Sequence, residues 1–196
     1  MNRGLRQCSA QWLITLLCLL SGGVLQAYPM LNHYRFGDRI WLTPWPQAIA
    51  DRIGIEKADV PVPPGALRIA HTPPGKTSVY DGLRSASAPG VLEMKCQVRQ
   101  TSGEGDFDVI FNFNRATGGN GSAGTRRFKV KADAQWREIT LYAAVPPETV
   151  SMQFVFALDG AARTLLLDDL YFGYAPDTIA VPVGGVRLDA PLTAAG

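Results

Sequence analysis

The chain has 196 residues and a formal net charge of +2, from 19 basic and 17 acidic side chains. Residues 1–27 contain Arg3 and Arg6 and no acidic residue, so the remaining chain holds 17 basic and 17 acidic residues and has no net charge. The densest basic group lies in residues 126–131, where it is interpreted as the solvated face of a strand. Without a net positive field, the chain is not expected to bind nucleic acid.

Residues 1–27 have the pattern of an export signal. The basic start is followed by an apolar run from Trp12 to Leu20 and by small residues from Ser21 to Ala27. The apolar run is about half of the roughly 20 residues that a spanning helix needs. We therefore expect cleavage after Ala27 and a periplasmic or secreted protein. The alternative is an uncleaved signal anchor, which would be the only membrane contact.

Cleavage would remove Cys8 and Cys18 and leave Cys96 as the single cysteine. An intrachain disulfide is then excluded, so in an oxidising compartment the fold must be stabilised by its hydrophobic core. Cys96 alternates with apolar residues of the same predicted strand. It is interpreted as a small buried hydrophobic side chain.

After the signal, a short helical turn is predicted within Pro46–Ile55, and the rest of the chain has the pattern of short strands separated by Gly and Pro. Apolar residues alternate with period 2 in these strands, as they do when one face of each strand is buried. The eight predicted strands are Ala66–Ala70, Lys76–Tyr80, Val91–Gln100, Phe107–Asn114, Arg126–Lys131, Trp136–Val145, Val150–Leu158 and Thr164–Tyr174. Strands at this spacing predict an all-β fold, an antiparallel β-sandwich.

The sandwich is expected to be one domain, residues 28–175. The tail, residues 176–196, is rich in Ala, Pro and Gly. It is expected either to add an edge strand at Ile179–Val183 or to be partly disordered.

Alternation also predicts which side chains face the core, because successive residues of a strand point to opposite sides. The predicted inward residues are Leu92, Met94, Cys96, Val98, Phe107, Val109, Phe111, Phe113, Ile139, Leu141, Ala143, Val145, Val150, Met152, Phe154, Phe156 and Leu158.

The segment from Trp136 to Tyr174 carries a resemblance to a known family. A strand that begins with a tryptophan is followed by Val-Pro-Pro, a phenylalanine-rich strand and a strand that reads LLLDDLYF. This order resembles the jelly-roll carbohydrate-binding modules that are appended to cellulases and xylanases. In them a strand near Trp136 runs into a Val-Pro turn, and the last strand carries an acidic pair like Asp168 and Asp169. The resemblance covers roughly residues 28–175 and implies a jelly roll in which Trp136 has a packing role.

The resemblance also implies a calcium hypothesis. In these modules one carboxylate of the acidic pair often joins oxygen ligands from the N-terminal segment around a structural calcium. Phe-Glu-Xaa-Gly is usual in that segment, whereas this chain has Phe36, Gly37 and Asp38. The candidate ligands are therefore Asp38, Asp168 and Asp169. Adjacent strand residues point to opposite faces, so only one member of the pair is expected to reach the ion. No other cofactor is expected.

A sugar site needs amides or carboxylates for paired hydrogen bonds and an aromatic ring to lie against the pyranose. Trp41 and Trp45, beside Pro44 and Pro46, are predicted either to form an exposed stacking platform or to cap the end of the sandwich, and the same alternatives apply to Tyr80. The outward polar residues that complete the candidate ligand-binding set are Glu93, Gln97, Asn112, Asn114, Tyr142 and Gln153. Outward polar residues are also what any exposed sheet face carries.

Catalysis has little support in the sequence. The chain contains no Gly-Xaa-Ser-Xaa-Gly motif, and Gly37-Asp38 is followed by Arg39 instead of the Ser of a Gly-Asp-Ser esterase. A glycosidase with paired carboxylates stays open if Glu93, Asp108 and Glu138 share a face.

The sequence therefore predicts a non-catalytic protein that binds a polysaccharide, either a β-glucan or an acidic polymer. It is expected to be an accessory of exopolysaccharide synthesis, modification or export, with other proteins of that machinery as further partners. The alternatives are a structural or protein-interaction sandwich without a sugar site and a small glycan-acting hydrolase.

Overall fold

The computed structural model describes residues 30–37, 39–86, 89–116, 121–176 and 185–191. The expected export signal, the candidate ligand Asp38 and the expected edge strand Ile179–Val183 lie outside these residues. Within them, no helix is both long and apolar enough to cross a membrane.

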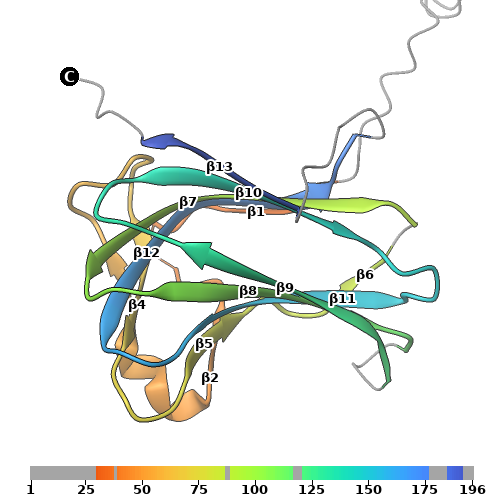
Figure 1. Ribbon diagram of the computed structural model, residues 1–196, viewed down its shortest axis with the longest axis horizontal. Coiled ribbons are helices and arrows are strands. Elements are labelled where there is room, and N and C mark those ends of the chain that lie inside the picture. The colour runs from red at the N-terminus through yellow and green to blue at the C-terminus, as the bar shows by residue number, and fades with distance from the viewer. Residues whose placement is uncertain (1–29, 38, 87–88, 117–120, 177–184, 192–196) are drawn as a thin grey trace, which may run out of the picture.

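Two sheets pack face to face as a sandwich, and every strand pairing is antiparallel (Figure 1). Sheet A has the order β13-β10-β7-β12-β4-β3, with β1 paired to β12. Its strands are β1 Met30–Tyr34, β3 Ile53–Glu56, β4 Ala66–His71, β7 Val91–Ser102, β10 Arg137–Ala144, β12 Arg163–Tyr174 and β13 Val186–Pro191.

Sheet B has the order β2-β5-β11-β8-β9, with β6 paired to β11. Its strands are β2 Thr43–Trp45, β5 Thr77–Tyr80, β6 Arg84–Ser85, β8 Asp106–Asn114, β9 Ser122–Lys131 and β11 Ser151–Leu158. Both sheets therefore combine strands that are distant in sequence, and this decides which outward side chains become neighbours.

All eight predicted strands are present, as β4, β5 and β7 to β12. The sequence did not indicate the short strands β1, β2, β3 and β6, each of which pairs with a longer strand. The helical turn predicted within Pro46–Ile55 is a 3₁₀-helix, η1 Gln47–Arg52, and the chain then enters β3 at once. The described part of the tail adds an edge strand, β13, beside β10.

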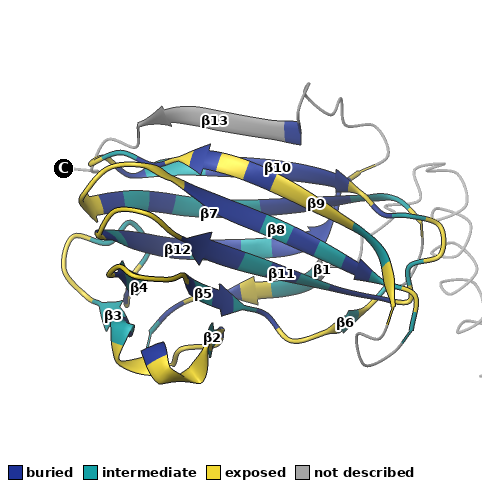
Figure 2. Ribbon diagram, turned by 60° about the horizontal axis from the view of Figure 1, so that its bottom comes forward, coloured by how far each residue is buried: buried dark blue, intermediate teal, exposed yellow. Residues whose placement is uncertain are grey.

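The core lies between the sheets, and in Figure 2 the buried residues follow the central strands while exposed residues gather in the turns and along β9. Aromatic rings dominate it: the ring of Phe154 lies 5.1 Å from that of Phe172, which stacks on Phe111 at 5.8 Å between centroids. Cys96 is fully buried among these side chains as predicted, and burial raises the pKa of its thiol well above the usual range. A protonated, buried thiol fits a packing role.

One inward prediction needs correction. Val150 is 42% exposed, because it precedes β11, whose regular alternation begins at Ser151. Trp136 is buried, as the resemblance implies, and packs with Ala66 and Leu166 in a small cluster apart from the main core. Both lie beside a strand end, where alternation no longer fixes the direction of a side chain.

Candidate functional site

The outer surface of sheet B carries an apolar strip that crosses three strands. Val155 in the middle strand β11 pairs with Tyr80 of β5 on one side and with Ile110 of β8 on the other. All three side chains face away from the core and are partly exposed. An apolar strip that contains a phenol ring suits the CH face of a pyranose.

Amide side chains run along one side of this strip. Gln153 of β11 pairs with Asn112 of β8, which pairs with Thr125 of β9. The amide nitrogen of Gln153 donates to the carbonyl oxygen of Asp81 at 2.9 Å, and the Thr125 hydroxyl donates to Asn112 Oδ1 at 3.3 Å. Each of these bonds uses one hydrogen-bonding position of a carboxamide that has four. The bonds therefore orient the two amides and leave positions for sugar hydroxyls.

Asp108 borders the other side of the strip, in the next row of β8. The residue is 9% exposed, and its Oδ2 lies 3.6 Å from the Arg127 guanidinium of β9. Its Oδ1 is buried and has no hydrogen-bond partner among the described residues. A buried carboxylate oxygen without a partner is costly to the fold. We call the strip, the two amides and Asp108 together the sheet B face.

The two tryptophans differ in the exposure of their rings and in their position relative to the sheet B face. Trp45 is 64% exposed at the β2 edge, in the row that continues through Ser78 towards Asp108. Trp41 is 50% exposed, but its indole nitrogen donates to the Arg35 carbonyl oxygen at 3.3 Å and it lines a separate pocket of about 330 Å³ beside η1. Only Trp45 lies in a row of the sheet B face.

The predicted ligand-binding residues fall on two opposite surfaces. Tyr80, Asn112, Asn114, Gln153 and Trp45 belong to sheet B, whereas Glu93, Gln97 and Tyr142 belong to β7 and β10 of sheet A. The Tyr142 hydroxyl donates to Glu93 at 3.0 Å, and both residues are buried although they face outward.

The topology separates one of the three carboxylates of the glycosidase hypothesis from the other two, which line one pocket on sheet A. Glu93 and Glu138 lie on sheet A, and Asp108 lies on the outer surface of sheet B, on the other side of the core. Sequence alternation correctly gave the outward direction of each carboxylate, but it does not say to which sheet a strand belongs.

Sequence reasoning missed the residues at the centre of the sheet B face. Ile110 and Val155 could have indicated this surface from the sequence, because they are apolar residues at outward positions of β8 and β11. An outward β-branched residue beside polar neighbours indicates either an interface or a ligand surface.

The acidic pair of β12 is held by the protein itself. Asp168 is buried, and its two oxygens accept hydrogen bonds from the backbone nitrogens of Val62 at 3.0 Å and of Asp169 at 2.8 Å. Burial raises the pKa of Asp168. Asp169 instead pairs with His33, Oδ1 to Nε2, at 2.7 Å. The expectation of opposite faces assumed a regular strand, whereas β12 shifts register after Asp168 and Asp169 has a φ of 46°.

Both oxygens of Asp168 are already engaged by backbone donors, and the third predicted calcium ligand, Asp38, lies outside the described residues. Calcium takes six to eight oxygen ligands, whereas the described residues contain no group of three or more His, Cys, Asp or Glu that could hold a metal ion. Chelation with EDTA is therefore expected to leave the melting temperature of the protein unchanged, as measured by calorimetry with and without added calcium. A fall of several degrees on chelation, restored by calcium, would contradict this, because a ligand bound only to the folded state stabilises it.

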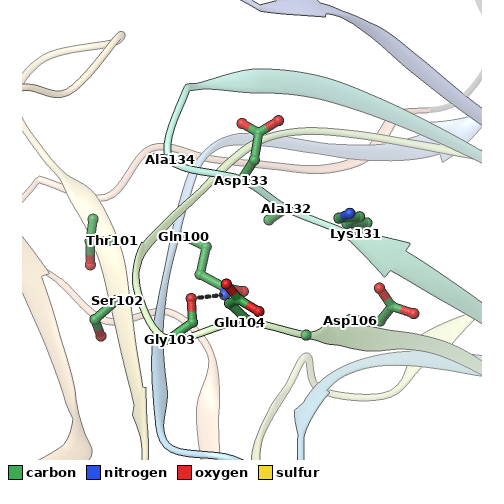
Figure 3. Close-up of a pocket in the computed structure, with 11 residues that line it drawn as sticks. Gln100, Thr101, Ser102, Gly103, Glu104, Asp106, Lys131, Ala132, Asp133 and Ala134 are labelled. Atoms are coloured by element: carbon green, nitrogen blue, oxygen red, sulfur yellow. Dashed lines mark hydrogen bonds between the residues drawn. The ribbon is translucent and has the colours of Figure 1, made fainter.

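A further hollow lies at one end of the sandwich, between the β7–β8 and β9–β10 turns (Figure 3). It has a volume of about 740 Å³ and is lined by Gln100–Asp106 and Lys131–Ala134. Its charged groups are Glu104, Asp106, Lys131 and Asp133, and no aromatic ring lines it. Without a ring to stack on, this hollow suits a sugar less well than the sheet B face does.

No protein-family model matches the chain, and no curated protein matches it. Among solved structures, the chain is similar to the CBM22-1 xylan-binding domain of Paenibacillus barcinonensis Xyn10C, with a TM-score of 0.53, 14% identity and coverage of 76% of this chain and 96% of that domain. The tandem CBM22-1-CBM22-2 domain of the same protein gives 0.55 and 13%, over 80% of this chain and 48% of that one.

The chain is also similar to the enzymatically active domain of tailspike protein 4 of bacteriophage CBA120, with a TM-score of 0.53 and 11% identity over 74% of this chain. It spans only 19% of that tailspike chain. At this level of identity the similarity concerns the fold. The chain therefore has the antiparallel jelly-roll β-sandwich that carbohydrate-binding modules share.

Proposed function

We propose that this protein binds a polysaccharide without transforming it, through the sheet B face. The observation that carries the proposal is the partly exposed strip of Tyr80, Val155 and Ile110, flanked by the oriented amides of Gln153 and Asn112. A sugar chain needs these two kinds of contact together, an apolar surface for its CH faces and polar groups for its hydroxyls. The similarity in fold to a xylan-binding domain supports the same proposal.

The charged groups of the sheet B face are compatible with two classes of polymer. Arg127 and Lys129 stand on the edge strand β9, and Lys129 pairs across the sheet with Asp108. Cations next to amides suit a β-glucan through hydroxyl contacts and an acidic polymer through its carboxylates. We propose that the polymer is an exopolysaccharide, and that the protein assists its synthesis, modification or export in the periplasm or outside the cell.

Tyr80→Ala is expected to weaken binding by about 1–3 kcal/mol, or roughly fivefold to 150-fold in Kd, because it removes the ring of the apolar strip. Trp45→Ala is expected to weaken it in the same direction, since the Trp45 ring is 64% exposed in a row of this face. Affinity electrophoresis in gels that contain neutral and acidic polysaccharides, followed by calorimetry, measures both.

Two controls make the test specific. Tyr80→Phe keeps the ring and is expected to retain most of the affinity. Trp41→Ala removes an exposed tryptophan of the same segment that lines the pocket beside η1 instead of the sheet B face. As a control, it is expected to bind polysaccharide as wild type does. A folded protein that no polysaccharide retards would contradict the proposal and favour a protein-interaction sandwich, and release of shorter sugars from any polymer would favour a hydrolase.

A further inference from the structure

A second polar pocket lies on the outer surface of sheet A, on the opposite side of the sandwich from the sheet B face. It has a volume of about 340 Å³ and is lined by residues of β1, β7, β10 and β12. In the middle row Lys95 of β7 pairs with Tyr171 of β12, which pairs with His33 of β1. We call this hollow the sheet A pocket; its polar lining includes His33, Glu93, Lys95, Glu138, Asp169 and Tyr171.

The carboxylate of Glu93 lines this pocket, is buried and is fixed in place by two polar contacts. The residue is only 4% exposed, and its carboxylate contacts the Lys95 ammonium at 3.1 Å and the Tyr142 hydroxyl at 3.0 Å. Burial of a carboxylate is costly unless it is paired and hydrogen-bonded, and an apolar residue would serve packing at least as well. The position of a charged residue here is therefore not explained by packing alone.

The opposite wall is shaped by an irregularity of the backbone. β12 shifts register between Asp168 and Tyr171, and Asp169 adopts a φ of 46°, which L-residues rarely do. In this conformation the Asp169 carboxylate lines the pocket and bonds to His33 at 2.7 Å. Bulges and strained residues are frequent where a protein must aim a side chain at a ligand.

The Tyr171 ring lies between these two walls. The Lys95 ammonium is 5.9 Å from its centroid, and the His33 ring meets it edge-on at 6.5 Å. The ring is thus held from both sides while it remains partly exposed. Carboxylate acceptors, an ammonium donor and a phenol ring are the groups that bind sugar hydroxyls and CH faces together, and the volume is at the lower end of ligand pockets.

From these contacts we infer that the sheet A pocket is a second saccharide site, which takes one neutral pyranose unit of a glycan chain. This inference rests on the proposed function, because it assigns the same class of ligand to both faces. With one site on each face, the protein joins two glycan chains or two segments of one chain. Such a bivalent protein would cross-link its polymer.

The test is the binding stoichiometry of the full chain with two neutral probes, cellohexaose and xylohexaose, measured by calorimetry. With the probe that binds, wild type is expected to take two hexasaccharides per chain. Tyr171→Ala is expected to take one, at the sheet B face. Tyr80→Ala is expected to lose the sheet B site or weaken it at least fivefold while the sheet A pocket still binds. Wild type, but not Tyr171→Ala, is also expected to raise the viscosity of a long polymer of the same sugar.

Glu93→Gln is a second variant for the case in which Tyr171→Ala does not fold, since it keeps the shape of the side chain and removes the charge. Its expected effect is at least a fivefold loss of affinity at the sheet A pocket alone. Thr164→Ala, on the same strand and partly exposed, is the matched control and is expected to bind as wild type does.

A single bound hexasaccharide, lost in Tyr80→Ala and unchanged in Tyr171→Ala and Glu93→Gln, would overturn the second site and leave the proposed function intact. Absence of binding by either probe, by wild type and by every variant, would overturn the second site. If longer polysaccharides also fail to bind, the proposed function is overturned with it.

Discussion

Replacing Trp136 by alanine is expected to lower the free energy of unfolding by about 3–5 kcal/mol, the cost of truncating a buried large aromatic residue. Trp136 fills a small cluster with Ala66 and Leu166 on the outside of sheet A, and its indole nitrogen donates to the carbonyl oxygen of Asp59 at 2.8 Å. Asp59 is itself tied by an ion pair to Arg99 of β7. The substitution therefore removes a packed ring and leaves a loop carbonyl without its donor.

Urea denaturation followed by intrinsic fluorescence or circular dichroism measures this loss. Trp136→Phe is the matched variant, because it keeps an aromatic ring and removes the hydrogen bond together with part of the packed indole. Its expected cost is about 1–2 kcal/mol. If Trp136→Ala cost less than about 1 kcal/mol, the cluster would be a surface contact and not a support of the sheet.

Arg84→Ala is expected to cost about 2–3 kcal/mol, because it leaves the buried carboxylate of Asp81 without its counter-charge. The Arg84 guanidinium meets both Asp81 oxygens, at 2.8 and 2.9 Å, and donates to the Tyr34 hydroxyl at 3.0 Å. The Asp81 side chain is only 2% exposed, whereas that of Arg84 is 37% exposed, so solvent reduces the penalty below that of a fully buried pair. Burial first, and then Asp81, raise the pKa of Tyr34.

Arg84→Lys keeps the charge and loses the two-pronged geometry, so a smaller cost is expected from it than from Arg84→Ala. The same denaturation measurement compares the two. Equal stability of Arg84→Ala and wild type would mean that solvent reaches Asp81 freely. Such a result would contradict the burial on which this prediction depends.

The fold was predictable because its long strands alternate cleanly. In β7, Met94 and Cys96 face the core while Lys95 faces outward, as period 2 requires. The short strand β2 contains Pro44, which cannot donate to a ladder, and forms only by pairing with β5. Such strands depend on tertiary contacts that local sequence does not carry.

The candidate sites were only partly predictable, for a reason of topology. Glu93 and Gln153 both satisfy the pattern of an outward polar residue, yet they lie on different sheets. Membership of a sheet is decided by how distant strands pair, which alternation does not report. The position of Asp169 in the sheet A pocket depends on a break in regular pairing that the adjacent letters Asp-Asp do not encode.

The most direct test of the account is to map where a sugar binds on the folded protein. The measurement is a titration of isotope-labelled protein with whichever of cellohexaose and xylohexaose binds in the calorimetry, followed through the backbone amide resonances. The account predicts saturable shifts of Tyr80, Ile110, Val155 and their neighbours on β5, β8 and β11. Shifts that spare these three strands at saturation would contradict a sugar site on the sheet B face.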